Sequence, residues 1–163
     1  MKYAIVYSSQ TGNTKLLAET LLDALPKEEC IYFGEPDSQA LQAEKIYVGF
    51  WTDKGTCDVQ TADFLKKLTN QNVFLFGTAG FGAGKEYFDK VLKRIEKNIY
   101  QDVNVFGTYM CQGKMPMSVR ERYVKMQNSA AKNLNVQSLI DNFDKALNHP
   151  NEGDLEALRK AVQ

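Results

Sequence analysis

The sequence has few of the residues that mark several large classes of protein. Among 163 residues there are three cysteines, one histidine and one tryptophan, and 20 basic against 20 acidic side chains give a net charge of zero. Widely spaced cysteines without a CxxC pair are typical of free thiols in a reducing compartment. A zero net charge gives no support to a nucleic-acid or anionic membrane partner. No stretch approaches the roughly 20 apolar residues of a membrane span, so we expect a cytoplasmic protein with no membrane partner.

The length and the hydrophobic content indicate one ordinary domain. The chain is 44% hydrophobic, which is enough for a core, and it contains no repeat or linker that would divide residues 1–163. No spacing of histidine, cysteine or carboxylate side chains suggests a metal site. His149 precedes Pro150 in a break between helical patterns, and we interpret it as a surface or capping residue.

Short apolar runs alternate with longer helical patterns along the chain. Each run is rich in β-branched and aromatic residues, which favours strands buried on both faces. Strands are expected at Tyr3–Tyr7, Cys30–Phe33, Lys45–Phe50, Asn72–Gly77 and Val103–Tyr109, and helices at Lys15–Leu25, Val59–Leu68, Lys85–Lys97, Ser118–Met126, Ser138–Leu147 and Asp154–Val162. This alternation predicts an α/β fold, a three-layer, doubly wound, five-stranded parallel sheet. Ligands of such folds bind outside the carboxyl ends of the strands, which points to loops 8–14, 50–58, 77–84 and 110–116.

The first of these loops has the composition of a phosphate site. Hydroxyl and amide side chains surround a single glycine, Gly12, which lets the backbone turn tightly. Asn13 and Thr14 lie at the start of the helix, where free N–H groups and the helix dipole attract an anion. The loop matches neither GxxxxGK[ST], the pattern of triphosphate-binding P-loops, nor GxGxxG, the pattern of dinucleotide-binding loops. It therefore suits one phosphate better than a triphosphate or a dinucleotide. A Ser/Thr-rich turn that caps the helix is the alternative interpretation.

The segment from Ile5 to Leu21 resembles the phosphate-binding motif of flavodoxins. The similarity lies in the strand residues and in the spacing of Ser9, Gly12 and Thr14. The order of strands and helices is similar to that of flavodoxins over nearly the whole chain. The resemblance implies a sheet of order 2-1-3-4-5 and flavin mononucleotide (FMN) as cofactor, with its phosphate wrapped by Ser9, Gln10, Thr11, Gly12, Asn13 and Thr14.

The loops after the third and fourth strands contain residues that could contact the face and the edge of a flat ring. Trp51, the only tryptophan, follows the third strand among polar residues. It could be an ordinary core residue, but an exposed aromatic there would stack on a conjugated ring, and flavodoxins commonly place one at this point. The small residues after Gly77 would let backbone N–H groups reach the pyrimidine edge of the flavin. The candidate residues are Phe50, Trp51, Thr52, Asp53, Lys54, Gly55, Thr78, Ala79, Gly80 and Phe81, of which Phe81 fits a flexible loop equally well.

The loop after the fifth strand gathers three methionines and one thiol at positions 110–117. Methionine-rich surfaces adapt to varied partners, and packing over the last helices is the alternative. Cys111 has no base near it in the sequence, so we assign it no nucleophilic role.

No side chain is assigned a catalytic role, because a bound flavin carries the redox chemistry itself. The resemblance implies a monomeric FMN-dependent electron-transfer protein that shuttles electrons between a reductase, which could be a dedicated one, and an acceptor enzyme. An NAD(P)H-dependent FMN quinone or flavin reductase of the same fold is the alternative. A phospho-acceptor receiver domain would need aspartates where Ser8 and Ser9 stand.

The chain departs from the flavodoxin pattern in two respects. Thr52 stands where flavodoxins usually carry a glycine whose backbone flips toward the reduced flavin. The net charge is zero, whereas many electron-shuttling flavodoxins are strongly acidic.

Overall fold

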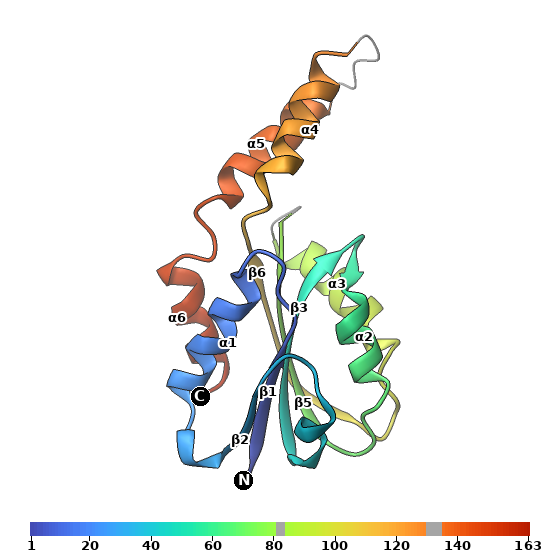
Figure 1. The fold of residues 1–163 in the computed structure, drawn as a ribbon, viewed down its shortest axis with the longest axis vertical. Coiled ribbons are helices and arrows are strands. Elements are labelled where there is room, and N and C mark those ends of the chain that lie inside the picture. The colour runs from blue at the N-terminus through green and yellow to red at the C-terminus, as the bar shows by residue number, and fades with distance from the viewer. Residues whose placement is uncertain (81–83, 130–134) are drawn as a thin grey trace.

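A parallel β-sheet forms the centre of the computed structural model, which describes residues 1–80, 84–129 and 135–163 (Figure 1). The strands are β1 (Tyr3–Tyr7), β2 (Cys30–Gly34), β3 (Lys45–Asp53), β4 (Thr56–Cys57), β5 (Asn72–Ala79) and β6 (Asn104–Gln112). Their order is β2-β1-β3-β5-β6, with all four neighbouring pairs parallel. This is the predicted order 2-1-3-4-5, and β4 adds a short antiparallel strand beside β3.

Helices cover both faces of the sheet, as the three-layer prediction requires (Figure 1). The helices are α1 (Asn13–Ala24), α2 (Val59–Leu65), α3 (Lys85–Glu96), α4 (Met117–Gln127), α5 (Val136–Ala146) and α6 (Glu152–Ala161). α1 and α6 lie on one face, and α2 and α3 lie on the other. α4 and α5 lie side by side and project beyond the carboxyl ends of the strands, and we call this pair the arm. Arg120 of α4 bonds to Asp144 of α5 over 2.8 Å, which holds the pKa of that carboxyl below its usual range.

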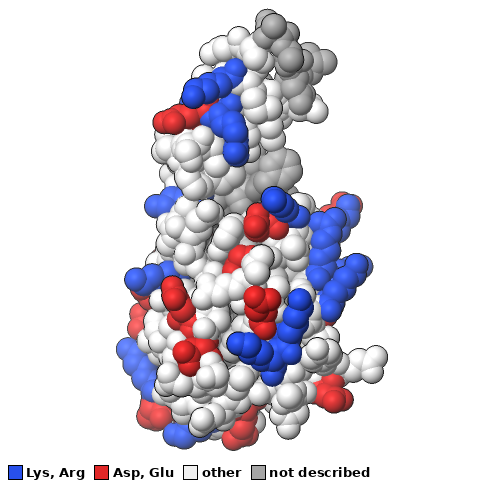
Figure 2. Space-filling model, turned by 45° about the vertical axis from the view of Figure 1, so that its right-hand side comes forward, with Lys and Arg blue, Asp and Glu red and all other residues white. Residues whose placement is uncertain are grey.

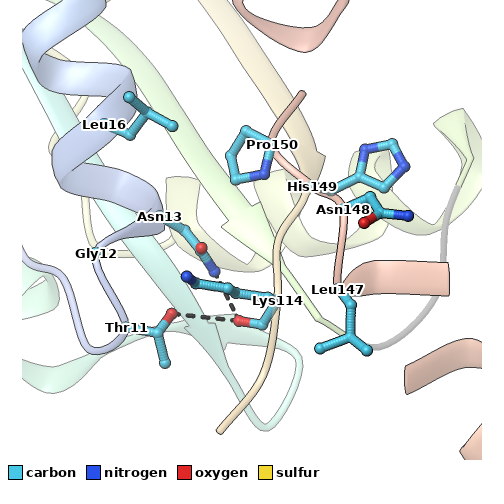
Figure 3. Close-up of a pocket in the computed structure, with 9 residues that line it drawn as sticks. All are labelled: Thr11, Gly12, Asn13, Leu16, Lys114, Leu147, Asn148, His149 and Pro150. Carbon is cyan, nitrogen blue, oxygen red and sulfur yellow. Dashed lines mark hydrogen bonds between the residues drawn. The ribbon is translucent and has the colours of Figure 1, made fainter. Parts of the chain in front are cut away.

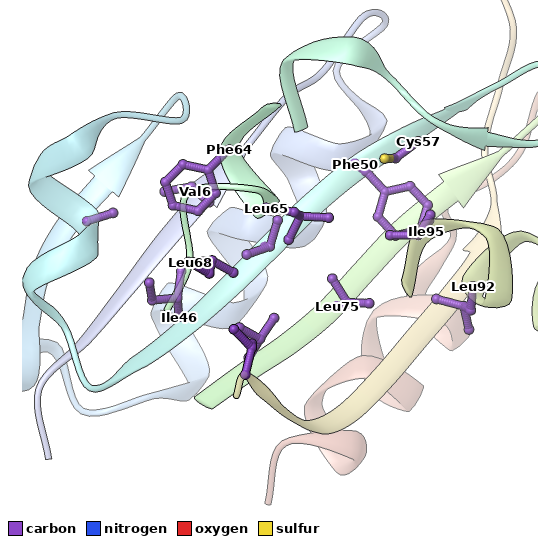
Figure 4. Close-up of a cluster of buried hydrophobic side chains, with 14 of the residues drawn as sticks. Val6, Ile46, Phe50, Cys57, Phe64, Leu65, Leu68, Leu75, Leu92 and Ile95 are labelled. Atoms are coloured by element: carbon purple, nitrogen blue, oxygen red, sulfur yellow. The ribbon is translucent and has the colours of Figure 1, made fainter. Parts of the chain in front are cut away.

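Two hydrophobic clusters fix these layers. The first lies between the sheet and α2 and α3, where Phe50, Leu75 and Ile95 are fully buried (Figure 4). The second joins the opposite face to α1 and α6, where Leu17 and Leu158 are fully buried. Because the central strands β1, β3 and β5 are covered on both sides, they are largely apolar, which is why the short apolar runs predicted them well.

The segment after the third strand differs from the prediction. A loop was expected from residue 50 onward, but β3 continues to Asp53 and turns back into β4, so that Trp51, Thr52 and Asp53 belong to a strand. The turn consists of Lys54 and Gly55, with φ of 53° and 85°. Two positive φ values make a tight hairpin turn, but lysine is an unusual residue for it. Gly55 is therefore the only residue of this turn whose type indicates a positive φ.

Smaller differences concern where elements begin and end. α1 begins at Asn13 rather than Lys15, and α2 ends at Leu65 rather than Leu68. β5 and β6 run to Ala79 and Gln112, past their predicted ends, because they keep pairing with each other to that point.

Candidate functional site

The loop between β1 and α1 directs main-chain N–H groups toward one point. Gly12 turns the chain with φ of 89°, and α1 starts at the next residue. The Oγ of Ser9 accepts hydrogen bonds from the N–H groups of Gly12 and Lys15, over 3.1 and 3.3 Å. The first turn of α1 contains no acidic residue. Two N–H groups at a helix N-terminus that converge on one oxygen form the geometry that holds a phosphate oxygen.

Three other side chains of this loop have protein partners, which the sequence did not indicate. The hydroxyl of Thr14 donates to the carbonyl oxygen of Phe50 over 3.0 Å. Thr11 Oγ1 and Asn13 Nδ2 both donate to the carbonyl oxygen of Lys114, over 3.2 and 2.8 Å. The main-chain N–H groups of the first turn therefore gain weight as donors for a ligand, beside the side chains of Ser9 and Gln10, since the first N–H groups of a helix have no acceptor inside it.

Residues 113–116, which we call the strap, cross the carboxyl edge of the sheet beside this loop. The strap continues β6, and its Gly113 N–H donates to the carbonyl oxygen of Ala79 over 3.1 Å. The side chain of Met115 packs so closely on Gly80 that a Cβ added there would collide with it. From the sequence, the methionine-rich loop was interpreted as a surface for varied partners or as packing over the last helices. Neither interpretation predicted that the loop would cross beside the loop between β1 and α1.

A small cleft lies where the strap meets the ends of β1, β3 and β5. Its volume is about 50 Å³, well below the roughly 300–1,000 Å³ of typical ligand pockets. Met115 and Pro116 close one side of it. The lining residues are Gln10, Thr11, Asn13, Trp51, Thr52, Thr78, Gly80, Lys114, Met115 and Pro116, so the structure brings all four predicted loops together.

Trp51 stands between this cleft and a larger cavity of about 370 Å³. Its main chain is fixed, because its N–H donates to Asp58 Oδ1 over 3.4 Å and its carbonyl oxygen accepts from the Asp58 N–H over 3.2 Å. Thr52 Oγ1 donates to the carbonyl oxygen of Thr78 over 2.8 Å and ties β3 to β5. The larger cavity is also lined by Ser8, Ser9, Gln10, Asp53, Asp58, Val59 and Gln60.

The placement of Phe50 corrects its assignment to the ring site. Successive side chains of a strand point to opposite faces, and Phe50 points into the core, fully buried against Gly77. Its carbonyl oxygen already accepts from Thr14. The side chain of Phe50 thus packs in the core beneath the site, while its neighbour Trp51 lines the two cavities.

Of the other predicted residues, those that the structure describes lie close to the cleft. Lys54 and Gly55 form the hairpin turn and line a further cavity of about 340 Å³ together with Thr52, Gly80 and Tyr87. Ala79 is buried, and the carbonyl oxygen of Gly80 accepts from Asn142 Nδ2 of the arm over 2.9 Å. Phe81 lies outside the described residues.

Lys114 is the main residue that the sequence did not single out. The loop after β6 was marked as a ligand loop, but nothing in its composition distinguished this lysine. Lys114 also lines a cavity of about 320 Å³ beside the first turn of α1 (Figure 3). The other lining residues are Thr11, Gly12, Asn13, Leu16, Leu147, Asn148, His149 and Pro150.

The buried thiols and the histidine show no nucleophilic arrangement. Burial raises the pKa of Cys111 to about 12 and that of Cys57 to about 11, so both remain thiols near neutral pH. The Nδ1 of His149 lies 2.6 Å from Asp154 Oδ2, next to the capping box of α6. His149 therefore lies in a helix cap.

Charged side chains of both signs are interspersed over the body of the molecule, with lysine and arginine side chains along the edge where α3 lies (Figure 2). Much of the arm is uncharged in the same view. Among the described residues, none of the helices combines the length and the apolar character needed to cross a membrane.

Comparison with known proteins gives consistent matches over the length of the chain. A family model described as a flavodoxin domain matches residues 4–163. A flavodoxin-like domain-containing protein BilS from Clostridium symbiosum (strain WAL-14163) is 39% identical, over 98% of this chain and 93% of the relative. A protein of the same name from Clostridioides difficile (strain CD3) is 30% identical, over 95% of this chain and 90% of the relative. The solution structure of two-electron reduced Megasphaera elsdenii flavodoxin has a similar fold, with a TM-score of 0.51 at 22% identity, covering 88% of this chain and 99% of that one.

Proposed function

Because the chain belongs to the flavodoxin domain family, we propose that it binds one FMN at the carboxyl edge of the sheet and transfers electrons between a reductase and an acceptor enzyme. The observation that carries the proposal is the convergence of the Gly12 and Lys15 N–H groups on one oxygen position. Bound FMN would supply the redox chemistry, which no side chain of the site can provide.

The phosphate end of FMN fits the loop between β1 and α1. A phosphate oxygen can take the acceptor position that Ser9 Oγ holds, and the positive end of the α1 dipole favours a negative charge there. Gly12 adds to the fit, since nothing lies within 4 Å of where its Cβ would be. A ligand can therefore approach this part of the backbone closely.

The ring end of FMN fits the region of Trp51, Thr78 and Gly80. Trp51 offers an aromatic face beside two cavities, and stacking on such a face favours a flat conjugated ring. The cleft of about 50 Å³ is smaller than the roughly 300 Å³ that small-molecule sites start from. Ring binding at this cleft therefore requires Met115 to move away from Gly80.

We propose that the partners are redox proteins recognised by shape and local contacts. A zero net charge and interspersed surface charges (Figure 2) provide no strong long-range field for steering. A dedicated reductase matches this surface better than a set of strongly basic partners does. We propose the monomer as the working form.

The experiment combines cofactor binding with a redox titration. Purified protein should carry flavin or take up FMN as apoprotein, and the uptake should quench the fluorescence of Trp51, the only tryptophan. An anaerobic titration should then show that the bound flavin is reduced by an added reductase but only slowly by NADPH alone. Rapid reduction by NADPH alone would favour the quinone or flavin reductase, and apoprotein that takes up no FMN would contradict the proposal.

A further inference from the structure

Lys114 is held in place by its main chain, which leaves its side chain free. Its N–H donates to the carbonyl oxygen of His149 over 3.0 Å. Its carbonyl oxygen accepts from Thr11 Oγ1 and Asn13 Nδ2, over 3.2 and 2.8 Å. The strap thereby fixes Lys114 against the first loop without using its ammonium group.

The side chain of Lys114 brings a positive charge to the start of α1. Figure 3 shows it extending from the strap toward Asn13, beside Gly12 and Thr11. Within the described part of the chain, Lys114 makes no ion pair. It is also the only ionisable side chain among the described residues that line the small cleft.

The charges gathered here lack a negative partner. A helix N-terminus carries a partial positive charge, and the ammonium of Lys114 lies close to the N-terminus of α1 (Figure 3). The first turn of α1 has no acidic residue that would compensate these charges. Positive groups that are brought together without a counter-charge cost free energy. An anionic ligand would remove that cost.

We infer that Lys114 is a specificity residue that recognises the phosphate of FMN and so selects the phosphorylated flavin over riboflavin. The inference rests on the proposed function. The loop between β1 and α1 contains no lysine of the P-loop kind, and the structure supplies one from the strap instead. A phosphate monoester carries about −1.5 to −2 charges at pH 7, whereas riboflavin ends in an uncharged hydroxyl. Only FMN therefore gains binding free energy from the ammonium group of Lys114.

The test compares FMN and riboflavin on three variants. Lys114→Gln removes the charge and leaves the strap intact, because the strap hydrogen bonds of Lys114 all use its main chain. Lys114→Arg keeps the charge, and Lys145→Gln is the matched control on the exposed side of α5. Each apoprotein is titrated with each flavin at low and high salt, with flavin fluorescence as the readout.

We expect Lys114→Gln to weaken FMN binding at low salt about tenfold and to leave riboflavin binding unchanged. Lys114→Arg and Lys145→Gln should bind FMN like the parent, and the difference between parent and Lys114→Gln should shrink at high salt. FMN binding unchanged in Lys114→Gln would overturn the inference while leaving the proposed function in place. An equal loss for both flavins would also overturn it, because Lys114 would then act through the strap or the ring. A parent protein that binds neither flavin would remove both proposals.

Discussion

The side-chain amide of Asn13 donates a 2.8 Å hydrogen bond to the carbonyl oxygen of Lys114, 101 positions further along the chain. This contact joins the start of α1 to the strap that follows β6. Thr11 donates to the same oxygen, and the Gly113 N–H continues the pairing of β6 with β5. The candidate site is thus assembled from loops that lie far apart in the sequence, and three residues of the strap line the small cleft.

Replacing Ser9 with aspartate should weaken FMN binding while stabilising the protein. A carboxylate in place of the Ser9 hydroxyl would accept from the Gly12 and Lys15 N–H groups and would interact favourably with the α1 dipole, by about 0.3–1 kcal/mol. The same carboxylate would compete with the phosphate and repel it. FMN affinity should fall at least tenfold, about 1.4 kcal/mol, as measured by fluorescence titration beside urea unfolding of the apoprotein.

Ser9→Asn is the control for this prediction, since it keeps an acceptor at the same place without the charge. Its FMN affinity should lie much nearer to that of the parent. If Ser9→Asp binds FMN as tightly as the parent does, then the phosphate lies elsewhere.

The sequence predicted the fold well and the candidate site only in outline, for a physical reason. The central strands β1, β3 and β5 are buried on both faces over most of their length, so each of them appears as a short apolar run, and the run of residues 72–77 corresponds closely to β5. The first loop was recognisable because its donors are adjacent in the sequence. Its contacts with Lys114 and Phe50 depend on long-range packing, which no local pattern encodes. The hairpin at Lys54 was missed because lysine seldom has positive φ.

Removing the side chain of Met115 should speed the binding of FMN. In the structure Met115 packs on Gly80 and closes the cleft, and binding that waits for a conformational change has a reduced association rate. Met115→Ala removes the part of the side chain that must move. The association rate of FMN, measured by stopped-flow fluorescence, should rise by about threefold or more.

Met117→Ala serves as the control, because Met117 lies at the start of α4 with 56% of its surface exposed. It should leave the association rate unchanged. Equal rates for Met115→Ala and the parent would show that the strap does not limit entry of the flavin.

Gly77 allows Phe50 to fill the core beneath the site. A Cβ on Gly77 would collide with the ring of Phe50, which is fully buried. Gly77→Ala should therefore lower the free energy of unfolding by about 1–3 kcal/mol through overpacking. Phe50→Leu makes room, so the double variant should recover part of that loss, with a coupling of about 0.5–3 kcal/mol in a urea-unfolding cycle. Strictly additive effects would mean that the two side chains do not compete for the same space.

The stability of the protein should fall in alkaline solution, in part through Cys111. Burial raises the pKa of this thiol from 9.0 to about 12. Between these values the unfolded chain has lost the proton and the native protein has kept it, so unfolding releases a proton. The stabilising contribution is complete below about pH 9 and is lost as the pH rises toward about 12.

Cys111→Ser and Cys111→Ala test this contribution, because neither variant has a thiol to ionise. The free energy of unfolding, followed in urea from about pH 8 to about pH 11, should decline less steeply than in the parent, by up to about 1.4 kcal/mol per pH unit. Some decline should remain, since burial also raises the pKa of Tyr109 and Tyr3. The two variants differ in packing and so in stability at neutral pH, but they should share the shallower slope. A slope equal to that of the parent would mean that Cys111 is exposed to water or ionised in the native protein.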